Sequence, residues 1–232
     1  MAGKVLPGEI ASVAALGDPI RRRLYEFVAQ QGESVSRDMA AAGVEIARHV
    51  AKFHLDKLEE EGLLETEYRR PSGKKGPGAG RPTKYYRRSS REISVSLPER
   101  HYDLAARVLA QAITMSQKSN TPIALALEKA AITFGQLMAQ EVHTKLQGGT
   151  DKVDVANAIS EVLDDHGYEP RMEEERLVLA NCPFHSLATE YTALICGINH
   201  NLMSALINDL PRSYKADLAP APGRCCVTLN EI

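Results

Sequence analysis

The segment RPSGKKGPGAGRP at residues 70–82 decides how the front of this chain folds. Its glycines and prolines exclude a helix or the interior of a strand. Between Arg69 and Arg91 there are nine lysines and arginines and no aspartate or glutamate. Apolar, aromatic and β-branched residues typical of strands lie on both sides of it, namely Leu63, Leu64, Thr66 and Tyr68 before it and Thr83, Tyr85 and Tyr86 after it. We therefore predict a β-hairpin with a cationic tip.

Helices are predicted upstream of this hairpin. Asp18 followed by Pro19 is a typical helix start, with an N-cap acceptor and a proline in the first turn. Ser36 can cap a short helix that runs to Ala42, and residues 43–46 form a turn. A further helix is predicted from Ala47 to Glu61, ending at a glycine. Two short helices about a turn form a helix-turn-helix arrangement.

The helix predicted from Ala47 to Glu61 has two contrasting faces. Its inward face carries Val50, His54, Leu55 and Leu58, whereas its outward face carries Arg48, His49, Lys52 and Phe53. With the hairpin behind it, this pattern predicts a winged helix-turn-helix, with base contacts from the helix and phosphate contacts from the wing. The alternative is an ordinary helical hairpin with solvated charges. The residues expected to contact DNA are Arg48, His49, Lys52, Phe53, Lys74, Lys75, Arg81 and Lys84.

The net charge of -2 conceals an asymmetry that agrees with this assignment. Residues 1–91 hold 17 lysines and arginines against 12 acids, whereas residues 92–232 hold 11 against 18. Only the front of the chain is therefore expected to meet a polyanion. No apolar run reaches the roughly 18 residues of a membrane span, and the first residues have no signal-peptide core. We expect a cytoplasmic protein, with no membrane partner and with reduced cysteines.

The rest of the chain predicts an α+β fold that is mostly helical. A helix that starts near Tyr102 is expected to have an apolar face formed by Tyr102, Ala105, Ala106, Leu109 and Ile113. Further helices with apolar faces are expected over residues 121–146 and 151–166, and long helices behind a winged helix often form a homodimer. A hairpin over 168–180, a helix over 186–209 broken near Gly197, and strands over 215–218 and 225–229 follow. The predicted domains are a winged helix-turn-helix at 1–92, helical dimerisation at 93–148 and an α+β sensor region at 149–232.

All four cysteines lie in the last region: Cys182, Cys196, Cys225 and Cys226. Their spacing is not that of a CxxC motif, but two histidines, His185 and His200, follow the first two cysteines at helical offsets. Three interpretations remain open. The thiols could hold an iron–sulfur cluster, could form a zinc site with one histidine, or could simply pack as buried residues, in which case the region could bind an organic ligand or nothing.

Two sets of segments carry a family resemblance. ALGDPIRRR at 15–23, RHVAKFHLDKL at 48–58 and EGLL at 61–64 resemble the ArsR-type winged-helix regulators, over about residues 8–92. NCP at 181–183, ICG at 195–197 and GRCCV at 223–227 resemble the Suf repressor group of that family, which binds an iron–sulfur cluster. In the ArsR type, glycine usually lies in the turn and serine or threonine caps the recognition helix, whereas Glu45 and Ala47 stand there here.

This resemblance implies a DNA-binding transcriptional regulator, in the repressor class and not an enzyme. It implies that Cys182, Cys196, Cys225 and Cys226 bind a 4Fe–4S cluster that controls affinity for double-stranded DNA, with His185 or His200 as a further donor. The alternatives are a regulator that senses zinc or a small organic ligand and, more remotely, a thiol enzyme using Cys182 and His185, which no oxyanion or phosphate loop accompanies.

Overall fold

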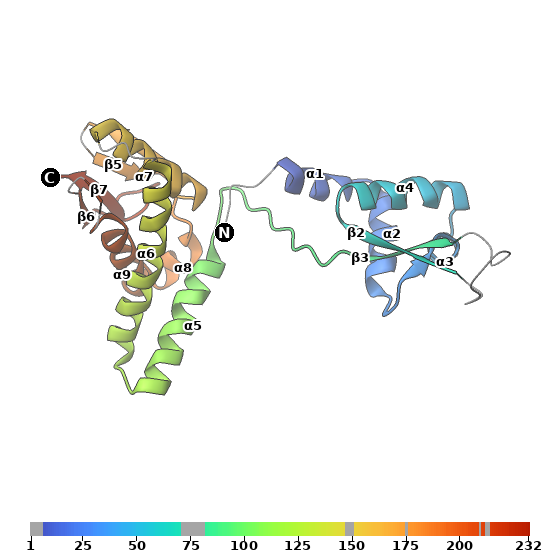
Figure 1. The fold of residues 1–232 in the computed structure, drawn as a ribbon, viewed down its shortest axis with the longest axis horizontal. Coiled ribbons are helices and arrows are strands. Elements are labelled where there is room, and N and C mark those ends of the chain that lie inside the picture. The colour runs from blue at the N-terminus through green and yellow to red at the C-terminus, as the bar shows by residue number, and fades with distance from the viewer. Residues whose placement is uncertain (1–6, 71–81, 147–150, 175, 209, 212–213) are drawn as a thin grey trace. The chain divides into compact units, whose positions relative to one another are not determined.

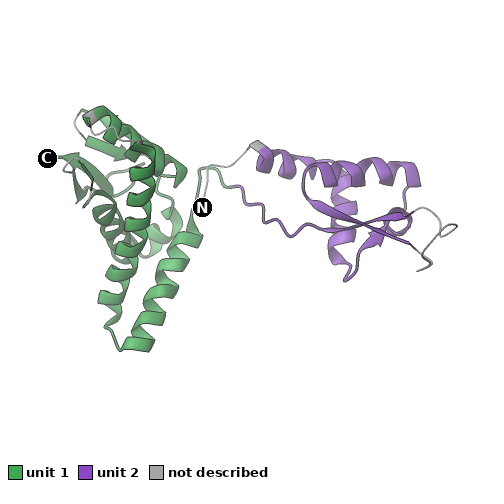
Figure 2. Ribbon diagram, viewed as in Figure 1, with its two compact units in different colours: residues 1–4, 96–232 green, residues 5–95 purple. Residues whose placement is uncertain are grey.

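The protein, seen here in a computed structural model, divides into two compact units that meet in the chain between Val95 and Ser96 (Figure 2). We call them the N-terminal unit and the C-terminal unit. The fold is α+β, and the sheet of each unit is antiparallel. The structure describes residues 7–70, 82–146, 151–174, 176–208, 210–211 and 214–232.

The N-terminal unit packs its helices against a small sheet (Figure 1). The sheet has the order β1-β3-β2, and in its hairpin Leu64 lies opposite Arg88. The predicted strands on either side of the basic segment are therefore confirmed, while residues 71–81 lie outside the described residues. The elements are α1 (Pro7–Ala15), α2 (Pro19–Gln30), β1 (Val35–Ser36), α3 (Arg37–Gly43), α4 (Arg48–Glu60), β2 (Leu64–Arg69) and β3 (Thr83–Arg88).

Two helix starts in this unit follow from side-chain caps. The Asp18 carboxylate accepts hydrogen bonds from the backbone N–H groups of Ile20 and Arg21, at 2.9 and 3.0 Å. The Ser36 hydroxyl accepts one from Met39 at 3.3 Å. Each cap satisfies backbone donors that the first helical turn leaves unpaired. Both predicted starts are confirmed, whereas α1 and β1 were not predicted.

The C-terminal unit places helices beside a second sheet with the order β4-β5-β7-β6 (Figure 1). Its helices are α5 (Tyr102–Ser119), α6 (Ile123–Leu146), α7 (Lys152–Asp165), α8 (His185–Glu190) and α9 (Thr192–Asn208). Its strands are β4 (Pro170–Glu173), β5 (Arg176–Leu179), β6 (Tyr214–Leu218) and β7 (Val227–Glu231).

One hydrophobic core joins the helices and the sheet of the C-terminal unit. Ala112 from α5, Met138 from α6, Ile159 from α7, Leu202 from α9 and Leu229 from β7 are all buried in it. The expected division between residues 93–148 and 149–232 is therefore not a boundary between compact units. The apolar faces of the central helices are the reason, because they pack against α7 and α9.

Three expectations for the C-terminal unit need correction. The break in the last long helix lies at Tyr191, between α8 and α9, and Gly197 remains helical. The final strand begins at Val227, so both adjacent cysteines precede it. The buried face of α5 is formed by Ala105, Val108 and Ala112.

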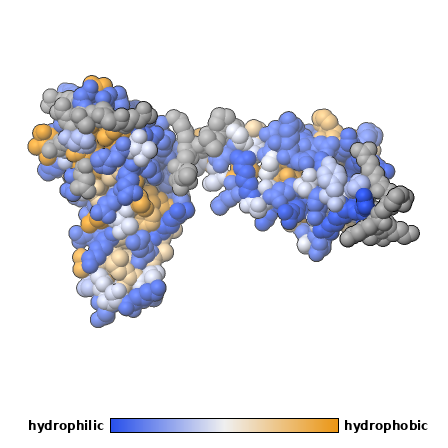
Figure 3. All heavy atoms as spheres, in the orientation of Figure 1, coloured by the Kyte–Doolittle hydropathy of each residue, from blue (hydrophilic) through white to orange (hydrophobic). Residues whose placement is uncertain are grey.

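Some apolar side chains of the α5–α6 hairpin face solvent. Ile113, Ile123 and Leu137 are each 49% exposed, and Figure 3 shows apolar surface on this part of the C-terminal unit. The expected homodimer stays a prediction. Among the described residues, no helix combines the length and apolar character that crossing a bilayer requires.

Candidate functional site

The residues of α4 that were expected to contact DNA are exposed to solvent. Arg48 and Lys52 have side chains that are 64% and 60% exposed, Phe53 is 68% exposed, and His49 is also exposed. The opposite face is buried against the N-terminal core through Ala51, His54, Leu55 and Leu58. The structure therefore confirms the two faces of α4 that the sequence predicts, except that Val50 is only partly buried.

The turn before α4 holds a non-glycine residue in a strained conformation. Glu45 has a φ of 56°, in the left-handed region that favours glycine. The N-cap of α4 is Ala47, which makes no side-chain capping hydrogen bond. The start of α4 is instead set by the turn, in which the N–H of Ile46 donates to the carbonyl of Ala41 at 3.0 Å.

Replacing Glu45 with glycine is expected to stabilise the N-terminal unit by about 0.5–1 kcal/mol. The left-handed conformation costs a residue with a side chain about 1–2 kcal/mol in the folded state, and glycine removes this cost. Glycine also increases the entropy of the unfolded chain, which offsets about half of the stabilisation. Urea denaturation followed by circular dichroism measures the change. Gly62→Ala is the matched control, because Gly62 has a φ of 72° and must show the opposite sign. Equal or reversed signs for the two variants contradict the explanation.

A groove of about 580 Å³ lies between α3, α4 and the β2–β3 hairpin. Its cations are partly paired: Arg48 forms an ion pair with Asp38, and the Lys52 ammonium lies 3.9 Å from Asp56. Exposed pairs of this kind contribute only about 0–1 kcal/mol, so a phosphate can compete for either cation. The lining residues are Ser36, Arg37, Asp38, Arg48, Lys52, Asp56, Tyr68, Pro82, Thr83, Lys84 and Tyr86.

Lys84 lines this groove, and its side chain is bonded to carboxylates of α4. Its ammonium donates to Asp56 at 3.1 Å and to Glu59, and it lies 5.2 Å from the centre of the Tyr86 ring. Partial burial alone would lower the pKa of Lys84, but the two carboxylates outweigh it and raise the pKa above its usual range. In the structure the charge of Lys84 attaches β3 to α4, and its expected DNA contact stays a prediction. The other expected hairpin contacts, Lys74, Lys75 and Arg81, lie outside the described residues.

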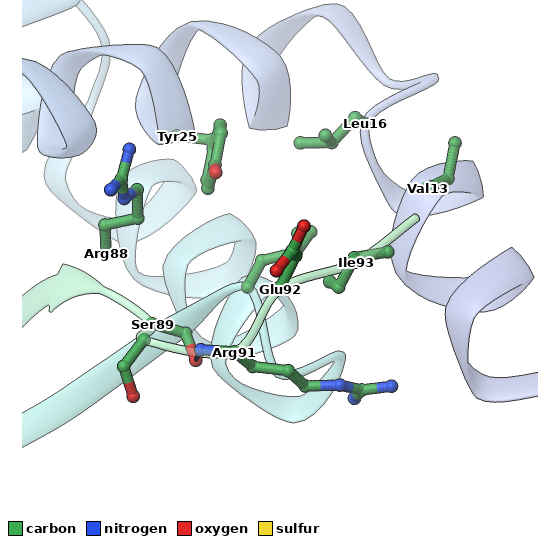
Figure 4. Close-up of a pocket in the computed structure, with 10 residues that line it drawn as sticks. Val13, Leu16, Tyr25, Arg88, Ser89, Arg91, Glu92 and Ile93 are labelled. Carbon is green, nitrogen blue, oxygen red and sulfur yellow. Dashed lines mark hydrogen bonds between the residues drawn. The ribbon is translucent and has the colours of Figure 1, made fainter. Parts of the chain in front are cut away.

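A second cavity, of about 400 Å³, lies where the chain leaving β3 passes α1 and α2. Figure 4 shows Val13, Leu16 and Tyr25 from the helices, opposite the segment that contains Arg91 and Ile93. Its wall is apolar on the helix side, and its rim is polar along residues 88–92. This cavity separates the segment after the hairpin from the helices and contains none of the cysteines.

The four cysteines come together at one end of the C-terminal sheet. Cys182 follows β5, Cys196 lies on α9, and Cys225 and Cys226 precede β7. The N–H of Cys225 donates to the carbonyl of Leu179 at 2.8 Å, which ties this segment to the end of β5. The four thiols are close enough to shift one another's pKa values: Cys182 and Cys225 affect each other, and so do Cys225 and Cys226, and Cys226 and Cys196.

Of the four cysteines, Cys182 and Cys226 have a lowered pKa, and Cys196 and Cys225 have a raised pKa. A hydrogen bond with Cys225 lowers the pKa of Cys182 despite burial. A hydrogen bond with Cys225 also lowers the pKa of Cys226, to about 6, with a further contribution from Cys196. The pKa of Cys196 is raised to about 12, first by burial and then by its bond to Cys226. Hydrogen bonding to both neighbours, with burial, raises the pKa of Cys225 far above its usual range. The four thiols therefore titrate as a coupled set.

The arrangement of the four cysteines was compared with the metal-binding geometry expected for an iron–sulfur or zinc site. Among the described residues, no three His, Cys, Asp or Glu side chains are placed to hold one metal ion. His185 is exposed at the start of α8, and a ring nitrogen of His200 is bonded to the carbonyl of Ala216 at 3.0 Å. A cluster or zinc site needs sulfur donors that converge on a common centre. The expected metal-binding group is therefore not found in the part of the chain that the structure describes.

Sequence reasoning missed the polar residues that surround the thiols. The amide of Asn199 donates to the Cys225 sulfur at 3.1 Å and accepts the Tyr168 hydroxyl at 2.7 Å. The amide of Asn181 donates to the Glu99 carbonyl at 2.9 Å and to the Gly167 carbonyl at 2.6 Å. Both asparagines are buried, and an asparagine next to Cys182 or three residues after Cys196 was the only available signal.

Comparisons with known proteins return no family for this chain. No protein-family model matches it, and no curated protein does. Among solved structures, human N-acetylserotonin methyltransferase in complex with SAM matches with 15% sequence identity and a TM-score of 0.26. The match covers 68% of this chain and 54% of that one, so the chain spans about half the length of the methyltransferase.

These findings correct the assignment made from the sequence motifs. No family model and no curated protein supports an ArsR-type regulator or a member of the Suf repressor group. The family assignment is therefore wrong. So is the function taken from it, a transcriptional regulator controlled by an iron–sulfur cluster, and no metal-binding group is found among the described residues.

Proposed function

We propose that the N-terminal unit is a winged helix-turn-helix that binds double-stranded DNA, with α4 entering the major groove. The observation that carries this proposal is the outward face of α4, where two cations and an aromatic ring are exposed opposite a face that packs into the core through Ala51, His54, Leu55 and Leu58. A major groove about 12 Å wide accepts one α-helix, and side chains on the outer face of such a helix reach the base edges.

The order of elements supports the same proposal. Helices α3 and α4 are joined by the short turn at 44–47, and the β2–β3 hairpin follows α4 directly. In a winged helix-turn-helix the second helix is the recognition helix and the hairpin reaches the neighbouring phosphates. The bonds from Lys84 to Asp56 and Glu59 hold the loop end of the hairpin strands against α4. Helix and hairpin are thereby presented to a ligand together.

The charges of the groove also suit a polyanion that arrives from solvent. Among the described residues, Arg48 pairs with Asp38 and Lys52 with Asp56, and these two carboxylate side chains are 57% and 38% exposed. Each carboxylate that loses its partner to a phosphate stays solvated, so the exchange has a small cost. The phosphate backbone of DNA then releases counterions, which makes binding strongly dependent on salt.

Titration of the full chain with a fluorescent duplex of mixed sequence tests this function. We expect an increase in anisotropy at 50 mM salt, and an affinity that falls with salt with a slope of about -0.9 for each phosphate contact. A single strand of the same length is the comparison ligand. An absence of binding at 50 mM salt, or binding that does not depend on salt, contradicts the proposal.

A further inference from the structure

The cavity of about 400 Å³ beside α1 and α2 is lined from elements other than α4, so its chemistry is separate from the proposed DNA contacts. Its volume falls within the roughly 300–1,000 Å³ of small-molecule sites, which combine an apolar wall with a few placed polar groups. The wall here includes Val13, Leu16, Leu63 and Ile93. Leu63 is buried, whereas Val13 is 47% exposed. A ligand that covers this wet apolar surface gains free energy from the water it displaces.

Charged side chains of both signs line the same cavity. Arg88 is the last residue of β3, and Glu92 lies in the segment that follows it. Figure 4 shows both side chains turned toward the helices, whereas Arg91 extends to the other side of the segment. There a Cβ built at Gly62 would lie 3.2 Å from the Arg91 guanidinium. Within the described part of the chain, the side chains of Arg88 and Glu92 have no ion-pair or hydrogen-bond partner.

We propose that this cavity binds a small zwitterion with an apolar side chain, which is the chemistry of an apolar α-amino acid. The guanidinium of Arg88 binds the carboxylate of the ligand, because its planar fork matches two carboxylate oxygens. The carboxylate of Glu92 accepts hydrogen bonds from the ammonium group. The apolar side chain of the ligand covers Val13 and Leu16 and contacts the ring of Tyr25.

The charges of the cavity favour a zwitterion over a simple anion or a simple cation. An anion bound by Arg88 would bring a negative charge toward Glu92, and a cation bound by Glu92 would bring a positive charge toward Arg88. The Cα atoms of residues four positions apart are separated by at most about 14 Å, so one small molecule can reach both side chains. Both charged groups lie on one segment and most of the apolar wall lies on another, so the ligand links the two.

Isothermal titration calorimetry of the full chain with L-phenylalanine tests the proposal. Matched ligands each lack one feature: phenethylamine has no carboxylate, hydrocinnamate has no ammonium, and L-alanine has no large apolar side chain. We expect L-phenylalanine to bind with a Kd below about 1 mM. Each matched ligand should bind at least about tenfold more weakly, because it leaves one group of the cavity without its partner. No saturable binding of L-phenylalanine, or equal binding of any matched ligand, overturns the proposal.

Single variants assign the two charged groups. Arg88→Gln should weaken L-phenylalanine at least about tenfold and leave phenethylamine within about twofold, because only the first ligand has a carboxylate. Glu92→Gln should likewise weaken L-phenylalanine and leave hydrocinnamate unchanged.

Arg87→Gln is the matched control for these variants. Neighbouring side chains on a strand point to opposite faces, and Arg87 bonds to Glu65 at 2.9 Å. This control should bind L-phenylalanine within about twofold of the unmodified chain, and circular dichroism shows whether each variant keeps its fold. Equal losses for Arg87→Gln and Arg88→Gln, or an Arg88→Gln loss that is the same for L-phenylalanine and phenethylamine, also overturn the proposal. Neither result depends on whether α4 binds DNA.

Discussion

Replacing Arg48 and Lys52 together with glutamate is expected to lower the affinity for duplex DNA by at least about 100-fold. Each side chain is expected to contribute about 1–3 kcal/mol through base or phosphate contacts, and each 1.4 kcal/mol is tenfold in affinity. Both residues lie on the exposed face of α4 and contribute no side chain to the core. The loss should therefore appear in binding and not in folding.

A matched pair in the C-terminal unit controls for the change in total charge. Lys118 on α5 and Lys129 on α6 are both exposed, and replacing them with glutamate changes the net charge by the same amount. This control should bind DNA with an affinity within about threefold of the unmodified chain, in line with the small effect of distant surface charges. Equal losses for the two double variants mean that α4 is not the DNA-binding face.

Replacing Gly135 with alanine is expected to destabilise the C-terminal unit by about 0.5–2 kcal/mol. A Cβ at this position would collide with the carbonyl of Leu202 and would lie 2.7 Å from the Cβ of Ala205. A backbone atom cannot move aside cheaply, so α6 and α9 must separate, which costs about 1–3 kcal/mol in a packed core. The usual gain of about 0.5–1 kcal/mol for alanine over glycine in a helix does not compensate. Thermal unfolding by circular dichroism gives the change, about 2–4 °C per kcal/mol for a unit of this size.

Gly197 provides the control on the facing helix. It lies within α9, and nothing lies within 4 Å of a Cβ built there. Gly197→Ala should therefore stabilise the unit by about 0.5–1 kcal/mol through helix propensity alone. If the two alanine variants shift stability in the same direction, the close approach of α6 and α9 is not the cause.

Much of the N-terminal unit is predictable because its signals are local. The side chain of Asp18 caps α2, that of Ser36 caps α3, and the basic segment after Arg69 separates two strands, all within a few residues of sequence. Short β1 gave no such signal, because its two residues are held only by pairing with Tyr85 and Tyr86 of a distant strand. The role of Lys84 also depends on distant residues, since Asp56 and Glu59 lie on another element.

The C-terminal unit was less predictable because its helices are rich in alanine. Periodicity on α5 suggested a face with Ile113, but the face that packs is the small one around Ala105 and Ala112, which permits close approach. Gly197 suggested a break, yet a glycine with open space around it stays helical. In both cases tertiary packing overrode the local pattern.

The spacing of the four cysteines in the sequence predicts only part of their arrangement in the structure. Sequence reasoning expected distant thiols to gather, and they do lie together, but no metal-binding group is found among the described residues. The difference depends on side-chain directions near Asn199 and on the start of β7 at Val227. Neither feature can be derived from the spacing of cysteines in the sequence.

Hydrogen–deuterium exchange of the full chain, with and without duplex DNA, tests most directly that α4 is the DNA-binding face. We predict that DNA slows exchange in residues 37–60 and in the strands 64–69 and 83–88, and leaves exchange of α5 and α6 unchanged. Protection confined to the C-terminal unit, or identical exchange in both samples at saturating DNA, would contradict the account.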